Sequence, residues 1–162
     1  MDCLRAFTAL IMAKIDIQAI RLNKDHIEGV HRLETLCFSE PWSQKSLEML
    51  VSSGAVGFVI LDGETVVAYG GMMCVLDEGQ ITNIAVDPLY RRRGYGKCIV
   101  NAIIFYALEH GIENISLEVR ESNESAIALY SSLGFEKRGI RKNFYRSPIE
   151  SAIVMVWEKE RT

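Results

Sequence analysis

The stretch NIAVDPLYRRRGYGK, from Asn83 to Lys97, decides how the rest of the chain is organised. It begins with a short apolar run, Ile84 to Val86, is broken by Asp87-Pro88, and continues into a basic turn that contains two glycines. After the turn, apolar residues recur at helical spacing. The stretch therefore predicts a strand, a turn and the first residues of a helix.

The turn has the composition of an anion-binding site. A helix N-terminus presents unpaired N–H groups and a partial positive charge, which favour a bound phosphate. Gly94 and Gly96 let the backbone approach a ligand closely. Although the net charge of the chain is -3, four cationic side chains cluster here, Arg91, Arg92, Arg93 and Lys97. The alternative is a solvated basic turn that holds no ligand.

Two common phosphate-binding motifs are excluded by the residues around these glycines. A P-loop has Ser or Thr after its Gly-Lys pair, whereas Cys98 follows Gly96-Lys97 here. A dinucleotide fingerprint has a third glycine three residues after the second, and Ile99 occupies that position. The turn is therefore neither a P-loop nor a dinucleotide fingerprint.

Length and composition predict one globular domain. With 162 residues, 49% of them hydrophobic, the chain can bury about 70% of its unfolded surface. We expect this domain to span residues 15–162, with residues 1–14 as an N-terminal extension. No apolar run approaches the ~18 residues of a membrane span, and the cysteines form no CxxC pair. The pI of 5.7 argues against general nucleic-acid affinity. We expect a cytoplasmic protein, a monomer or weak dimer, without metal, membrane or nucleic-acid partners.

Hydrophobic periodicity and turn signals predict the order of elements. We expect a strand at 15–22, a helix capped by Asn23 and ending near 37, a helix capped by Ser43, a hairpin of strands 56–61 and 65–74, a strand at 80–86, a helix ending at 111, a strand at 115–119, a helix capped by Asn123, and strands at 135–140 and 152–157 separated by a polar-aromatic loop at 141–148. This is an α/β chain with a mixed (α+β) sheet, in the order strand, two helices, three strands, helix, strand, helix, two strands.

The motif and this order of elements resemble the GNAT N-acetyltransferases. Their acetyl-coenzyme A loop has Gln or Arg, two residues, Gly, one residue, and Gly or Ala, a pattern that Arg91 to Gly96 matches. The segments Leu117 to Arg120 and Asn123 to Tyr130 resemble the bacterial RimI family, which acetylates the N-terminal alanine of a small-subunit ribosomal protein. Phe144 departs from that family's usual tyrosine.

The resemblance implies roles for three groups of residues. Glu118 would be the general base and Tyr130 the general acid; a solvent-facing strand residue and a core aromatic are the alternatives. The donor, acetyl-coenzyme A, would be held by Ile84, Ala85, Val86, Arg91, Arg92, Arg93, Gly94, Tyr95, Gly96, Lys97 and Asn123. A protein N-terminus would contact Pro41, Trp42, Asn143 and Tyr145, for which a packed loop is the alternative.

The chemistry of acetyl transfer favours an α-amine as acceptor. The attacking amine must be neutral, and at pH 7 this costs an α-amine about 1.4 kcal/mol and a lysine about 4.6 kcal/mol. A lone carboxylate suffices more easily for the α-amine. The resemblance thus implies direct transfer to a protein N-terminus, in particular that of a ribosomal protein. The alternatives are acetylation of lysine or of a small-molecule amine, and a non-catalytic acyl-coenzyme A-binding module.

Overall fold

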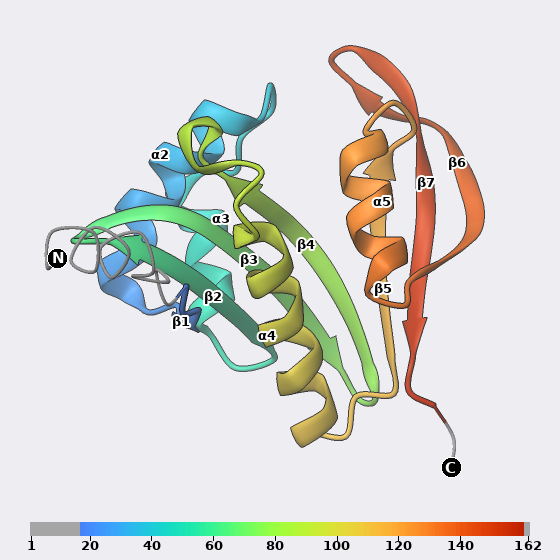
Figure 1. Ribbon diagram of the computed structural model, residues 1–162, viewed down its shortest axis with the longest axis horizontal. Helices are drawn as coiled ribbons and strands as arrows, with labels where there is room; N and C mark the ends of the chain where they lie inside the picture. The colour runs from blue at the N-terminus through green and yellow to red at the C-terminus, as the bar shows by residue number, and fades with distance from the viewer. Residues whose placement is uncertain (1–16, 161–162) are drawn as a thin grey trace, which may run out of the picture.

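The computed structural model describes residues 17–160 and contains one seven-stranded sheet in the order β1-β2-β3-β4-β5-β7-β6 (Figure 1). The elements are β1 (Ile20–Arg21), α2 (Ile27–Cys37), α3 (Gln44–Leu47), β2 (Ala55–Asp62), β3 (Thr65–Val75), β4 (Glu78–Val86), α4 (Tyr95–Glu109), β5 (Asn114–Arg120), α5 (Glu124–Ser132), β6 (Glu136–Arg146) and β7 (Ile149–Glu158). The predicted mixed sheet and order of elements are confirmed. The expected N-terminal extension, residues 1–14, lies outside the described residues. No helix within residues 17–160 is long and apolar enough to cross a membrane.

The first half of the sheet is covered on both faces. Val56, Phe58 and Ile60 of β2 pack in one core with α4, whereas Val59 packs in a second core with α2 and α3. This alternation follows from the period of two along a strand. A Cβ on Gly70 of β3 would lie 2.5 Å from the Cγ2 atom of Ile99, so α4 rests directly on the sheet.

Side-chain caps fix where the helices begin, as predicted. Asn23 accepts the N–H of Asp25 and forms a capping box with the 3₁₀ turn that precedes α2. The Oγ of Ser43 accepts from the N–H of Ser46 at 3.1 Å. The side chain of Asn123 accepts the N–H of Ala126 at 3.2 Å. Such caps satisfy donors that the helix itself leaves unpaired.

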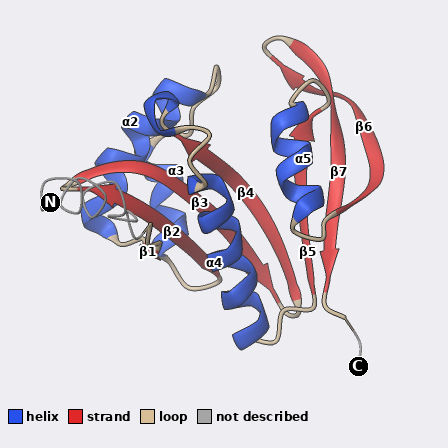
Figure 2. Cartoon of the chain, viewed as in Figure 1, coloured by secondary structure: helices blue, strands red, loops and turns tan. Residues whose placement is uncertain are grey.

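The parallel strands β4 and β5 separate toward their C-terminal ends. They pair only where Glu78–Gln80 meets Asn114–Ser116, and Figure 2 shows them side by side at one end and apart at the other. A bulge bends β4 near this point: Gly71 pairs with Asn83 and Met72 with Ile81, which leaves Thr82 as an extra residue. The fold therefore opens the sheet beside the stretch that follows Gln80.

The prediction of a loop at 141–148 is wrong for most of that range. Residues 141–146 continue β6, and only Ser147-Pro148 forms the turn into β7. Two register shifts, at Arg138 and between Arg141 and Tyr145, interrupt the period of two. Since β6 is also an exposed edge strand, it needs no apolar alternation, and the usual strand signal is absent from its sequence.

Candidate active site

A cleft of about 780 Å³ lies where β4 and β5 separate. Its walls come from the loop after α2, from residues 80–84 of β4, from residues 117–120 of β5, from Asn123 and Tyr130, and from the hairpin of β6 and β7. The C-terminal ends of parallel strands are the usual place for ligands in α/β sheets. The cleft is therefore the candidate active site.

Glu118 projects into this cleft from β5. Ile115, Leu117 and Val119 point to the opposite, buried face of the strand, so the strand period brings Glu118 to the open face. Its carboxylate accepts Nη1 of Arg141 at 2.7 Å and Nε2 of Gln80 at 3.4 Å. The Glu118 side chain is 15% exposed, which leaves it accessible from the cleft.

Tyr130 lines the same cleft from α5. Burial raises the pKa of its hydroxyl well above the ordinary value of 10, because loss of water disfavours the phenolate. Among residues 17–160 the hydroxyl finds no hydrogen-bond partner, while its ring packs against Phe135 at a centroid distance of 5.8 Å. The cleft thus brings the Glu118 carboxylate and a buried phenol that keeps its proton to one site.

The basic turn begins α4 with two left-handed residues. Arg92 has φ 63°, and Gly94, the N-cap, has φ 87°. Successive left- and right-handed residues turn their N–H groups toward one point, a nest that favours an anion. A Cβ on Gly96 would lie 3.2 Å from Leu129 and 3.8 Å from Val86. The turn therefore adjoins both β4 and α5 at the end of the cleft.

The residues predicted to hold acetyl-coenzyme A fall into three groups: some are exposed, some are buried, and some line the cleft. Arg92, Arg93 and Lys97 are exposed, whereas the Tyr95 side chain is buried against Tyr90. Arg91 turns back, with Nε donating to the carbonyl of Val86 at 3.1 Å. From the same predicted set, Ile84 and Asn123 line the cleft itself, while Ala85 is buried beneath α2.

Of the predicted acceptor residues, the structure brings Trp42 and Tyr145 to the cleft, but neither Pro41 nor Asn143. The guanidinium of Arg120 lies 4.2 Å from the ring centroid of Tyr145. Arg120 also donates to the carbonyls of Ser147 and Pro148, both at 3.1 Å, and pairs with Glu150 at 3.0 Å. One β5 side chain therefore anchors the whole β6–β7 turn.

The loop that carries Trp42 and the β6–β7 hairpin that carries Tyr145 meet across the cleft. The hydroxyl of Ser39, after α2, donates to the carbonyl of Ser147 at 2.6 Å. Near the same side, the Arg141 guanidinium stacks on Phe144 at 4.7 Å. The acceptor side of the cleft is therefore bounded by contacts between segments far apart in the sequence.

Comparison with known proteins identifies the family of this site. The family described as Acetyltransferase (GNAT) matches residues 27–135. The chain belongs to the GNAT acetyltransferases. The ribosomal protein bS18-alanine N-acetyltransferase of Escherichia coli (strain K12) is 35% identical over 136 residues, which cover 83% of this chain and 92% of that protein.

Two solved structures extend the comparison. The crystal structure of the ribosomal-protein-S18-alanine N-acetyltransferase from Escherichia coli has a TM-score of 0.82 at 32% identity, covering 90% of this chain and 95% of that one. Arabidopsis thaliana NAA60 in complex with acetyl-CoA shares the fold, with a TM-score of 0.81 at 18% identity over 88% of this chain and 98% of that one. The chain is thus a GNAT-type N-acetyltransferase.

Several residues in and around this GNAT cleft were not predicted from the sequence. Gln80 and Arg141 both contact Glu118. Gln80 had no motif to mark it, and Arg141 lies in the polar-aromatic segment 141–148 but was given no role. Glu34 is fully buried and lies seven residues after Ile27, on the buried face of α2 with Val30 and Leu33. A charged residue at that position of an amphipathic helix was the one available signal.

Cys37 also lines the GNAT cleft and was not predicted there. Burial raises the pKa of its thiol, although the guanidinium of Arg91 acts in the opposite direction. Because the thiolate is the nucleophilic form, Cys37 is poorly suited to carry the acetyl group. Cys98 is turned away, with its Sγ 3.5 Å from the carbonyl of Ile17.

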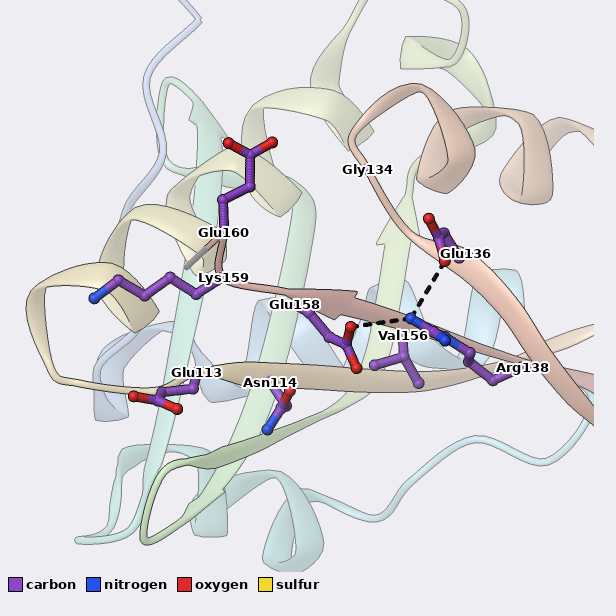
Figure 3. A pocket seen from close by; sticks show the side chains of 9 residues that line it. All are labelled: Glu113, Asn114, Gly134, Glu136, Arg138, Val156, Glu158, Lys159 and Glu160. Carbon is purple, nitrogen blue, oxygen red and sulfur yellow. Dashed lines mark hydrogen bonds and ion pairs between the residues drawn. The ribbon is translucent and has the colours of Figure 1, made fainter. Parts of the chain in front are cut away.

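A second cavity, of about 560 Å³, lies at the other end of β5 (Figure 3). Most of its lining is charged, and Arg138 pairs with Glu136 at 3.2 Å and with Glu158 at 3.0 Å. It contains neither Glu118 nor Tyr130 and lies where β4 and β5 are still paired. Its lining has four carboxylates and two cations and lacks the candidate acid–base pair, so it is not the candidate active site.

Proposed function

We propose that this enzyme transfers acetyl directly from acetyl-coenzyme A to the α-amine of an N-terminal alanine on a small-subunit ribosomal protein in the cytoplasm. The acceptor is the one for which the Escherichia coli relative is named. The observation that carries the proposal is the placement of Glu118 and Tyr130 in one cleft at the opening of β4 and β5. A proton acceptor and a proton donor are both needed for amide formation from a thioester.

The acetyl donor, acetyl-coenzyme A, fits the unpaired edge of β4. Since the β4–β5 ladder stops at Gln80, the edge of Ile84 that faces β5 has no strand partner and is free to hydrogen-bond the pantetheine arm. The pyrophosphate would lie on the turn of Arg92 to Lys97, where exposed cations and the N–H groups of α4 converge. The shared fold of NAA60, solved with acetyl-CoA, supports this placement.

The reaction then follows from the two side chains. The neutral α-amine attacks the thioester carbon, forming a C–N bond, and its proton passes to the Glu118 carboxylate. A backbone N–H of the bulged strand β4 would stabilise the developing oxyanion. The C–S bond breaks, and the sulfur takes the proton of Tyr130. Return of the proton from Glu118 to Tyr130 through water completes the cycle, leaving an acetylated N-terminus and coenzyme A.

The acceptor side of the cleft supports a chain terminus rather than a side chain within a folded surface. The contact between Ser39 and Ser147 joins the two acceptor loops, and Trp42 and Tyr145 line the space that they bound. An extended terminus can pass between such loops. The low cost of neutralising an α-amine, about 1.4 kcal/mol at pH 7, points in the same direction.

A substrate screen tests this proposal. Two peptides share one sequence, which begins with alanine and contains an internal lysine. The N-terminus is free in the first peptide and acetylated in the second. A third sample contains polyamines. Intact mass and thiol release are measured with acetyl-coenzyme A. We expect acetylation of the free alanine peptide alone. Turnover of the blocked peptide or the polyamines would make this a lysine or small-amine enzyme. Calorimetric binding of acetyl-coenzyme A without any acetylation would make it a binding module.

A further inference from the structure

Glu34 is a buried carboxylate that bonds to three segments, two of which line the candidate active site. Its Oε1 accepts the hydroxyl of Tyr69, from β3, and Nδ2 of Asn83, from β4, the latter at 2.5 Å. Its Oε2 accepts the backbone N–H of Trp42 at 2.9 Å. Asn83 and Trp42 both line the cleft, whereas Glu34 itself does not.

The donors around Glu34 are all neutral. Within residues 17–160 no cationic side chain pairs with this carboxylate, which is 0% exposed. Burial, followed by the charge of Glu34, raises the pKa of the Tyr69 hydroxyl far above its ordinary value, so Tyr69 remains a donor. A buried charge without a cation costs several kcal/mol of desolvation, and an apolar side chain of similar volume often stabilises a fold better. Stability alone does not account for a carboxylate here.

The main chain of Trp42 is held at both its N–H and its carbonyl by one helix. Glu34 accepts its N–H, and Nδ1–H of His31, one turn earlier on α2, donates to its carbonyl at 3.0 Å. Asn83 lies directly after the bulge at Thr82. The same carboxylate therefore sets both the Trp42 loop and the bulged part of β4.

We propose that Glu34 is a positioning residue for the acceptor amine, which it directs toward Glu118 by holding the Trp42 loop and Asn83 in register. This role of Glu34 depends on the proposed function in one respect: an amine must be acetylated in the cleft. The donor turn has no contact with Glu34, so the effect is confined to the acceptor.

Four variants test this assignment in steady-state kinetics with each substrate varied separately. Glu34→Met keeps the volume but removes every acceptor; it should raise KM for the acceptor peptide roughly 10- to 100-fold, as expected for lost bonds to a charged group. Its KM for acetyl-coenzyme A should stay within about 2-fold of wild type.

Glu34→Gln, which still offers an oxygen to the Trp42 N–H, should restore acceptor KM to within about 3-fold of wild type. Tyr69→Phe is the matched stability control: it removes one bond to Glu34 but none to the cleft, and should lower Tm while leaving acceptor KM nearly unchanged.

His31→Ala keeps the test decisive if Glu34→Met does not fold, because His31 is only partly buried. It should raise acceptor KM about 3- to 10-fold through loss of one hydrogen bond. Acrylamide quenching of Trp42 fluorescence, measured in a Trp157→Phe background, should increase in His31→Ala and in Glu34→Met without any substrate present.

The outcomes separate this proposal from the proposed function. If the wild type acetylates only an amine other than N-terminal alanine, the proposed function fails and the variants are compared on that amine. If the wild type acetylates none, the quenching measurement alone decides. Unchanged Trp42 quenching, or a parallel rise of both KM values, overturns the role of Glu34.

Discussion

The donor and acceptor sides of the cleft are built in different ways. The donor side comes from one continuous stretch, Ile84 to Lys97, whose strand, turn and helix start follow one another along the chain. The acceptor side is assembled by contacts such as Ser39 to Ser147, 108 residues apart, and Glu34 to Asn83, 49 residues apart. A contiguous site depends on local backbone conformation, and an assembled one depends on a few long-range side-chain bonds. The two sides should therefore respond to different substitutions.

The largest effect is expected where the two sides meet. Glu118→Gln removes the proton acceptor and should lower kcat roughly 10²- to 10⁴-fold. Calorimetry should give an acetyl-coenzyme A affinity close to that of wild type, since Glu118 does not adjoin the basic turn. Glu121→Gln, an exposed acid three residues later, is the matched control and should keep normal turnover. Wild-type kcat in Glu118→Gln would remove Glu118 from the mechanism.

The pH dependence of the reaction tests the second member of the pair. The neutral fraction of an α-amine with pKa ~7.8 rises roughly 40-fold between pH 6 and pH 8, and kcat/KM for the alanine peptide should follow it. Burial raises the pKa of Tyr130 above 10, so the phenol keeps its proton and no alkaline loss of rate should occur below about pH 9.5. A falling limb below pH 9 that disappears in Tyr130→Phe would contradict the raised pKa, whereas wild-type kcat in Tyr130→Phe would remove Tyr130 from the mechanism.

A smaller effect should isolate the donor side. Gly94 has φ 87°, and a methyl group added at its Cα would have no atom within 4 Å, so Gly94→Ala introduces backbone strain without a steric clash. A left-handed alanine costs about 1–2 kcal/mol, which the free turn avoids by relaxing. Regaining the binding conformation then costs this energy, a rise of roughly 5- to 30-fold in KM for acetyl-coenzyme A. Acceptor KM should not change. Gly139→Ala, which is equally uncrowded but has no positive φ, should behave as wild type; equal effects of both substitutions would exclude a specific role for the turn.

The same difference explains what could be predicted from sequence. Helix caps at Asn23, Ser43 and Asn123 and the hairpin of strands 56–61 and 65–74 are local signals, and the structure has all of them. The position of Glu118 on the open face of β5 followed from strand alternation. These features depend on neighbours in the chain.

The features that were missed depend on distant neighbours. The extension of β6 through 141–146 is stabilised by pairing with β7 and interrupted by bulges, so its residues show no strand period. Arg141 reaches Glu118 only because that edge strand exists. Pro41 and Asn143, predicted to contact the acceptor, do not line the cleft, whereas their neighbours Trp42, Phe144 and Tyr145 do. A motif locates such a loop but does not determine which of its side chains point inward.

The independence of the two sides is tested most directly by combining one substitution from each. Initial rates are measured over a grid of acetyl-coenzyme A and acceptor concentrations for Gly94→Ala, His31→Ala and the double variant. We predict that each single variant raises only its own KM, and that the double variant shows both increases with a coupling below about 0.5 kcal/mol. A single variant that raises both KM values, or a coupling well above that limit, would contradict the separation of donor and acceptor sites.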